Sequence, residues 1–271
     1  MARADTILAV GTELSEDLYG NPISFKGTLI QIDLDTAAFE CNLRTDIALN
    51  SDACSTLGAL LEKIPAVGDK MPRGRDRVDD LKTRIQGEKQ TVLAYDDFAL
   101  MLEILDGVRK ALPEDAIFCA DSTSAAYVGY SEFPAYLPST YIYPCGFGTL
   151  GLALPAAIGA KSAYPERAVC ALAGDGGFQF TMAEIGVACQ EKLCVPLIIW
   201  DNGGFGEIRN YEEIRHPGRR IAVDHQNPDF LKLAEAYGIT GSEVTNGDEM
   251  KEALEKALAE KGPSIILINS K

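Results

Sequence analysis

Short apolar runs alternate with amphipathic stretches through most of the chain after residue 91. A stretch with apolar residues at helical spacing (98, 101, 102 and 105) precedes the first run, and helical patterns or Gly-rich loops separate the later ones. Strands that are apolar on both faces are typical of a parallel sheet covered by helices on both sides. We therefore predict an α/β fold with a doubly wound parallel sheet over residues 91–271. Its expected strands are 116–120, 140–143, 168–172, 196–200 and 264–268, and its further expected helices lie around 155–160, 181–192 and 247–261.

Residues 1–64 show a shorter version of the same pattern. Apolar strands are expected at 6–10 and 27–33, followed by an amphipathic helix that ends near Ile64. Because two strands are too few for a self-sufficient sheet, this segment is interpreted as half of a domain. Residues 65–90 are rich in charge, Gly and Pro, and are predicted to be a linker.

Length and composition limit the number of domains and the kinds of molecule that the protein is expected to bind. A length of 271 residues suits about two domains. The 40 acidic residues outnumber the 25 basic ones, giving a formal charge of -15. This charge repels phosphate backbones and anionic lipid, so neither nucleic acid nor a membrane is expected as a partner.

The cysteines and the start of the chain indicate a cellular compartment. The 7 cysteines form no C-x-x-C pair, and most lie in apolar strings, which predicts free, buried thiols. Only 2 histidines are present, which disfavours a zinc site. No signal-peptide pattern or membrane-spanning apolar run is apparent, so a soluble, cytoplasmic protein is expected.

Gly146 to Gly151 spell G-x-G-x-x-G between an expected strand and an expected helix. Taken alone, this motif indicates dinucleotide binding, with backbone close to a pyrophosphate at a helix N-terminus. A Gly-rich turn needed only for packing is an equal alternative. No acidic residue for a ribose follows at the end of the next strand.

A second Gly-rich loop, Gly174-Asp175-Gly176-Gly177, directly follows an apolar strand. Its successive N–H groups would form an anion nest, and Asp175 offers a hard oxygen ligand, so phosphate and a divalent metal could share the loop. The alternative is an ordinary turn before a helix that opens at Thr181.

A third loop, Asp201-Asn202-Gly203-Gly204, follows the next apolar strand. Residues 176–201 leave room for one loop, one helix and one strand between Asp175 and Asn202, so the two side chains should leave neighbouring parallel strands at the same edge. Carboxylate, amide and backbone carbonyl oxygens there, with diphosphate oxygens and water, would complete an octahedral Mg²⁺ shell.

These loops resemble the thiamine diphosphate-dependent enzymes of the acetolactate synthase, pyruvate oxidase and 2-oxo-acid decarboxylase group. That family carries a GDG loop followed by Asn-Asn, and here Asp201 replaces the first Asn. The resemblance implies Asp175, Asn202 and the Gly204 carbonyl as Mg²⁺ ligands. It implies Gly176 and Gly177 as backbone donors to the diphosphate.

The resemblance gives the first loop a different meaning and displaces the dinucleotide interpretation. Leu150 takes the place of the apolar residue that bends the cofactor, and the Gly148 carbonyl would face its aminopyrimidine. Ser122 and Thr123 fall where the family has another loop around the diphosphate, although a polar loop leading into a helix explains them equally well. The full set of expected cofactor-binding residues is Ser122, Thr123, Gly148, Thr149, Leu150, Gly174, Asp175, Gly176, Gly177, Asn202, Gly204 and Phe205.

The resemblance also implies what lies outside this chain. Residues 1–64 are similar to the C-terminal half of the family's central Rossmann-like domain, through Leu29 to Asp35, and residues 91–271 to its diphosphate-binding domain. Family members are about twice as long and carry the activating glutamate in a pyrimidine-binding domain that is not found here. No catalytic residue is therefore assigned, and the isolated chain is expected to be inactive. Some relatives bind FAD in the central domain, but without its first half that site is expected to be empty.

The implied activity is decarboxylation of a 2-oxo acid, with or without carboligation, in a homodimer or homotetramer. The alternative is a cofactor-binding module without turnover, such as a fragment, a split subunit or a degenerate relative. Glu207 stands where acetolactate synthases carry an apolar residue, which suggests a cationic 2-oxo acid such as a guanidino acid. A solvent-facing glutamate favoured by the helix dipole is the alternative explanation.

Overall fold

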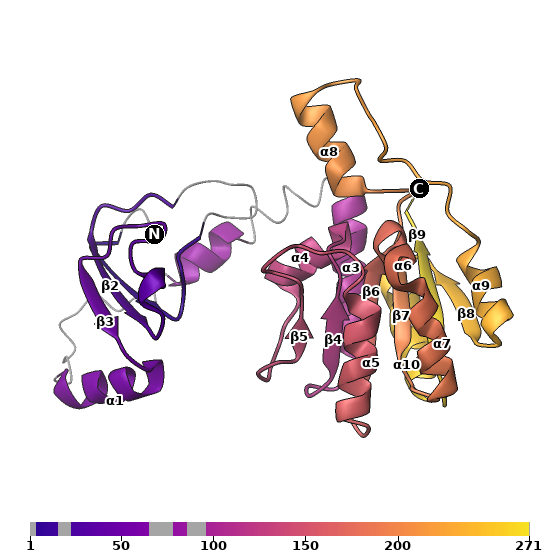
Figure 1. The fold of residues 1–271 in the computed structure, drawn as a ribbon, viewed down its shortest axis with the longest axis horizontal. Helices are drawn as coiled ribbons and strands as arrows, with labels where there is room; N and C mark the ends of the chain where they lie inside the picture. Colours follow the sequence, from indigo (N-terminus) through magenta and orange to yellow (C-terminus); the bar gives the residue numbers. More distant parts are fainter. Residues whose placement is uncertain (1–3, 16–22, 65–77, 86–95, 271) are drawn as a thin grey trace. The chain divides into compact units, whose positions relative to one another are not determined.

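The computed structural model describes residues 4–15, 23–64, 78–85 and 96–270. The chain divides into two compact units, Met1–Asp80 and Leu81–Lys271 (Figure 1). Most of the expected linker, 65–77 and 86–90, lies outside the described residues, and its middle part, 78–85, is helical.

The smaller unit contains a three-stranded parallel sheet in the order β1-β2-β3. The expected first and second strands and the helix α1 are confirmed, whereas β3 was not predicted because only four residues form it and most of them are exposed. Its described elements are β1 (Thr6–Val10), β2 (Thr28–Asp33), the 3-10 turn Thr36–Ala38, β3 (Ile47–Asn50) and α1 (Ala53–Lys63). Asp52 caps α1 by accepting the N–H of Ser55 at 2.9 Å, which satisfies one of the free donors of the first turn.

The larger unit is built on a six-stranded sheet in which every neighbouring pair is parallel, in the order β5-β4-β6-β7-β9-β8. All five predicted strands are confirmed. The sixth, β8, was not predicted because its polar sequence leaves most of this edge strand exposed. The strands are β4 (Ile117–Ala120), β5 (Tyr141–Ile142), β6 (Val169–Gly174), β7 (Pro196–Asp201), β8 (Thr240–Val244) and β9 (Ser264–Asn269).

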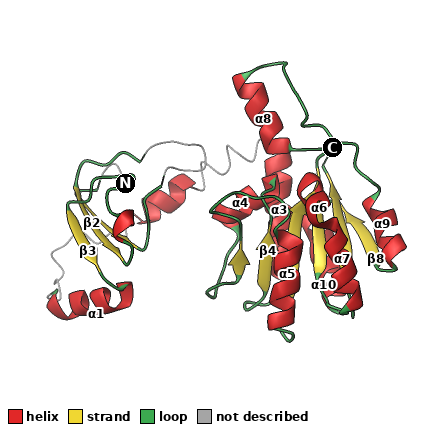
Figure 2. Cartoon of the chain, in the orientation of Figure 1, coloured by secondary structure: helices red, strands yellow, loops and turns green. Residues whose placement is uncertain are grey.

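Helices cover both faces of this sheet, so the doubly wound prediction is confirmed (Figure 2). Along β6, Cys170 and Leu172 belong to the core on one face, and Val169, Ala171 and Ala173 to the core on the other. The first face is covered by α3 (Asp96–Ala111), α4 (Ser124–Glu132) and α10 (Gly247–Leu258). The second face is covered by α5 (Ala153–Ala163), α6 (Asp175–Thr181), α7 (Ile185–Gln190) and α9 (Phe230–Tyr237).

Two expectations need correction. The helix expected to open at Thr181 begins at Asp175 and is interrupted by a 3-10 turn, Met182–Glu184, before α7. Gly176 and Gly177 suggested a loop, but they lie in the first turn of α6, where close neighbours leave no room for a side chain. All seven cysteines are free, but only Cys119 and Cys170 are buried, because these two lie in the central strands β4 and β6. The other five are exposed or half-exposed.

No described helix is both long and apolar enough to cross a membrane.

Candidate functional site

A cavity of about 240 Å³ opens at the carboxyl edge of the larger sheet. From β4 the chain first adds β5 on one side and then β6 on the other, so the cavity lies where the strand order reverses. Ligands of open α/β sheets bind at this kind of position. The lining residues are Ser122, Thr123, Ser124, Tyr127, Gly148, Leu150, Gly174, Asp175, Gly176, Gly177, Asn202, Gly204, Phe205, Gly206, Glu207 and Ile208.

The N-terminus of α6 forms one wall of the cavity. A Cβ on Gly176 would lie 2.7 Å from a ring carbon of Phe205, and one on Gly177 would lie 2.6 Å from Oδ2 of Asp121. Glycine is therefore required by space at both positions. The first N–H groups of a helix have no partner within the helix, and together with the positive end of the helix dipole they make this terminus suitable for an anion.

Oxygen donors gather next to this terminus. Asp175 starts α6 and is 1% exposed, while Asn202 follows β7, and β6 and β7 are hydrogen-bonded neighbours as predicted. Oδ1 of Asn202 is buried without a hydrogen-bond partner among the described residues. The turn continues to Gly204, whose φ of +153° favours glycine and whose carbonyl accepts the N–H of Gly206 at 3.1 Å.

Asp121 supports the loop that carries Gly148 and Leu150. Its carboxylate is fully buried and accepts the N–H groups of Gly151 at 2.7 Å and Leu152 at 3.3 Å. Burial raises the pKa of Asp121, and these backbone donors oppose that rise. Asp121 therefore holds the loop between β5 and α5 against the end of β4.

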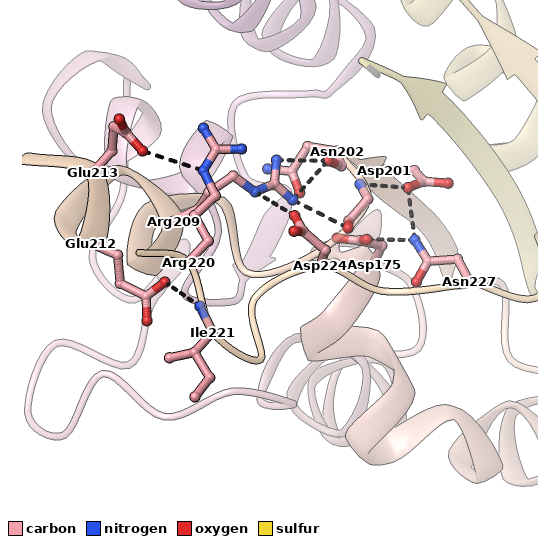
Figure 3. Close-up of polar contacts among 11 residues, drawn as sticks. Asp175, Asp201, Asn202, Arg209, Glu212, Glu213, Arg220, Ile221, Asp224 and Asn227 are labelled. Atoms are coloured by element: carbon pink, nitrogen blue, oxygen red, sulfur yellow. Dashed lines mark hydrogen bonds and ion pairs between the residues drawn. The ribbon is translucent and has the colours of Figure 1, made fainter. Parts of the chain in front are cut away.

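Asn227 joins the carboxylates at the ends of β6 and β7 (Figure 3). Its Nδ2 donates to Oδ2 of Asp175 and, at 2.8 Å, to Oδ1 of Asp201. Burial is the main cause that raises the pKa of Asp175, and the hydrogen bond from Asn227 acts in the opposite direction. Asp201 also accepts the N–H of Gly203 at 3.0 Å, which fixes the turn after β7.

Arg209, on α8 (Gly206–Arg215), holds the same turn from the other side (Figure 3). Its guanidinium donates to the Gly203 carbonyl at 3.2 Å and forms an ion pair of 3.0 Å with Asp224. The N–H of Phe205 donates to the carbonyl of Val223 at 2.9 Å. The turn is thus clamped between α8 and the segment 223–225.

Glu207 lies in the first turn of α8 and lines the cavity. Burial raises the pKa of its carboxyl group. Tyr127 lines the same cavity, and burial together with the negative charge of Glu207 raises the pKa of its hydroxyl. No described residue forms a hydrogen bond or an ion pair with the Glu207 carboxylate.

The structure brings all but one of the expected cofactor-binding residues to this cavity. The exception is Thr149, which does not line it and directs its hydroxyl to the neighbouring Leu150 carbonyl at 3.3 Å. Sequence reasoning missed the contacts made by Asp121 and Asn227. Asn227 precedes a proline in a stretch without periodicity, so only its place before the cap of α9 could have drawn attention to it.

The chemistry of these donors fits a divalent cation bound together with a diphosphate. A carboxylate, an amide oxygen without a partner and a backbone carbonyl are the hard oxygen ligands that Mg²⁺ prefers. The described residues contain no group of three His, Cys, Asp or Glu that could hold a metal, so a cation here would depend on this mixed set. The glycine-bearing terminus of α6 fits the phosphates.

Comparison with known proteins gives a consistent assignment. Residues 121–268 match the family described as thiamine pyrophosphate enzyme, C-terminal TPP binding domain. A probable 2-ketoarginine decarboxylase of Pseudomonas aeruginosa is 35% identical over 269 residues, covering 98% of this chain and 47% of that protein. The large subunit of acetolactate synthase isozyme 3 of Escherichia coli is 28% identical, covering 95% of this chain and 46% of that protein.

A solved structure shows the same fold. The thiamine diphosphate-dependent 4-hydroxybenzoylformate decarboxylase of Rhodococcus jostii RHA1 matches with a TM-score of 0.71 and 26% identity, covering 98% of this chain and 49% of that chain. The chain thus spans about half the length of the relatives it matches.

Proposed function

Because the chain belongs to the thiamine pyrophosphate enzyme family, we propose that it is the part of a 2-oxo-acid decarboxylating enzyme that binds thiamine diphosphate and Mg²⁺. The observation that carries the proposal is the convergence of buried oxygen donors and a glycine-bearing helix N-terminus on one cavity. The names of the two decarboxylases and the synthase among the relatives support this reaction class.

Each group around the cavity has a role in this proposal. Asp175, Asn202 and the Gly204 carbonyl hold the cation, and the N–H groups of Gly176 and Gly177 receive the diphosphate. Leu150 would pack against the bound cofactor. When bound, thiamine diphosphate supplies the electron sink for loss of CO₂ from a 2-oxo acid.

The remaining predicted residues surround these groups. Ser122 and Thr123, between β4 and α4, contribute hydroxyls beside the phosphates, and Gly148 offers its carbonyl to the aminopyrimidine. Phe205 packs edge-on against His225, with 4.3 Å between the ring centroids, and both rings lie close to Gly176 in the cavity wall.

Glu207 favours a substrate with a positively charged side chain. It is a half-buried carboxylate in the cavity wall, and no described cation pairs with it. Leaving a carboxylate desolvated and unpaired is costly, and a guanidinium or ammonium of the ligand would offset that cost. The relative named as a probable 2-ketoarginine decarboxylase supports a guanidino acid.

Substrate competition in the assembled enzyme tests this specificity. We expect 2-oxo-5-guanidinovalerate to be preferred over pyruvate, and Glu207→Gln to reduce the ratio of the two kcat/KM values by about 10- to 100-fold, the value of a charged hydrogen bond. Glu252→Gln, at an exposed position on α10, is the matched control. Unchanged selectivity in Glu207→Gln would refute the assignment.

We propose that activity also requires a pyrimidine-binding domain with its own glutamate, in a homodimer or homotetramer. The support is that the chain spans about half of its relatives. The same observation favours a second candidate, a cofactor-binding module without turnover. Incubation with thiamine diphosphate, Mg²⁺ and a 2-oxo acid should give no CO₂ from this chain alone and restored release when the pyrimidine-binding domain is supplied. Release by the chain alone would contradict the requirement, and no release after addition would favour the module.

A further inference from the structure

The side chain of Asn227 is fully engaged although it belongs to none of the recognised motifs. Its amide nitrogen donates hydrogen bonds to Asp175 and to Asp201, and its Oδ1 accepts a hydrogen bond from Nε2 of Gln179 at 3.0 Å. Gln179 also donates to the backbone carbonyl of Asp175 at 3.2 Å. The orientation of the Asn227 amide follows from this network, because carboxylates only accept and the glutamine NH₂ only donates.

The two carboxylates that Asn227 connects stand at the ends of adjacent strands and are nearly inaccessible. Asp175 is 1% exposed and Asp201 is 5% exposed. One NH₂ group has one hydrogen for each of them, so it holds both in fixed orientations and reduces their mutual repulsion. A hydrocarbon side chain at position 227 could do neither.

The contacts of Asn227 bear on the geometry of the proposed cation site. Oδ2 of Asp175 accepts the hydrogen bond from the Asn227 amide, so Oδ1 is the carboxylate oxygen more available to a cation. Asp201 meanwhile fixes the turn that carries Asn202 and Gly204 through the N–H of Gly203. Asn227 therefore links the carboxylate ligand on one strand to the turn with the other two ligands on the next.

We infer that Asn227, oriented by Gln179, is a positioning residue that sets the ligand geometry for the divalent cation, an inference that rests on the proposed function. Groups that hydrogen-bond to metal ligands fix their orientation, and losing one costs about 10- to 100-fold in metal affinity. Mg²⁺ requires near-ideal octahedral geometry, whereas Ca²⁺ accepts longer and more variable distances. Loss of Asn227 therefore weakens Mg²⁺ binding more than Ca²⁺ binding.

Equilibrium dialysis of the chain against Mg²⁺ or Ca²⁺, with thiamine diphosphate in excess, tests this inference. Asn227→Ala should lower the affinity for Mg²⁺ by about 10- to 100-fold and that for Ca²⁺ clearly less, so that the ratio of the two affinities falls. Asn210→Ala, at an exposed asparagine of α8 outside the cavity lining, is the matched control and should change neither.

A second variant keeps the test decisive if Asn227→Ala does not fold. Gln179→Met alters an exposed side chain and should shift the ratio in the same direction by a smaller factor. Equal loss of both metals would indicate a merely structural role and, like unchanged affinities, would overturn the inference. A wild-type chain that binds neither metal would overturn the proposed function, and this inference with it.

Discussion

The two units of the chain use the same kind of parallel sheet in different ways. In the larger unit, every residue of β4, β6 and β7 is buried, and hydrophobic cores lie on both faces of the sheet. In the smaller unit, β1 buries only Ala9, and neither β3 nor α1 contributes a buried residue. The described hydrophobic residues buried in the smaller unit are Ala9, Leu29, Ile32 and Ala38.

This difference explains where the polar chemistry lies. The larger unit buries three carboxylates, Asp121, Asp175 and Asp201, at one sheet edge and supplies each with hydrogen-bond donors. Burying such groups costs free energy, which these hydrogen bonds and a large apolar core together offset. The only buried polar side chain described in the smaller unit is that of Gln31, whose amide donates to the carbonyls of Thr12 and Ala38.

Hydrogen exchange should show the largest contrast between the units. We expect the amides of β1–β3 to exchange at least about a thousandfold faster than those of β6 and β7, equivalent to about 4 kcal/mol in opening free energy, because few apolar contacts resist local opening. Exchange measured by mass spectrometry on peptides from both units decides this. Equal protection would contradict the comparison.

A methyl group at the α6 terminus should damage the site. Gly177→Ala places a Cβ against the buried Asp121 carboxylate, so we expect at least a tenfold loss of affinity for thiamine diphosphate, or about 1.4 kcal/mol. Gly159→Ala in α5, where a Cβ meets open space, is the control. Calorimetric titration of both variants with thiamine diphosphate measures the two affinities. Similar affinities would contradict the proposal that the N-terminus of α6 binds the cofactor.

The same substitution in helices of the two units should have opposite effects on stability. Gly107 of α3 lies against the backbone of Gly247, so Gly107→Ala should lower the free energy of unfolding by about 1–3 kcal/mol through overpacking. Gly58 of α1 faces open space, so Gly58→Ala should raise it by about 0.5–1 kcal/mol. Denaturant unfolding of the two variants checks the signs, and destabilisation by both would contradict the packing difference.

The pH dependence of stability should also have opposite signs for one acid in each unit. Burial raises the pKa of Glu207 above its ordinary 4.5, so its favourable contribution is complete below that pH and is lost as pH rises through the folded-state pKa. The N–H and hydroxyl of Ser55 lower the pKa of Asp52 below 3.8, so its contribution is present above that pH and is lost as pH falls through the folded-state pKa.

Thermal unfolding at about pH 2, about pH 4 and about pH 7 separates these cases, because the acidic step includes the titration of Asp52 and the neutral step that of Glu207. Relative to wild type, Glu207→Gln should gain stability between pH 4 and pH 7, and Asp52→Ala should lose stability between pH 2 and pH 4. Shifts of the same sign in both variants would contradict the assigned causes.

Much of the fold and the site follows from local sequence. Apolar strands and their order identified the larger sheet. Asp175 and Asn202 could be assigned to one site because they follow β6 and β7, which are adjacent strands. The start of α6 was missed because its glycines, which disfavour helices locally, are imposed by tertiary contacts with Phe205 and Asp121. Asn227 was missed because its role depends on contacts with residues far away in the chain.

The central claim is that the carboxyl edge of the larger sheet binds thiamine diphosphate through a cation held by Asp175. Calorimetric titration of thiamine diphosphate into the chain, with and without Mg²⁺, tests it most directly. The account predicts saturable binding that depends on Mg²⁺ in the wild type and is lost in Asp175→Ala. Equal affinity of Asp175→Ala and wild type in the presence of Mg²⁺ would contradict it.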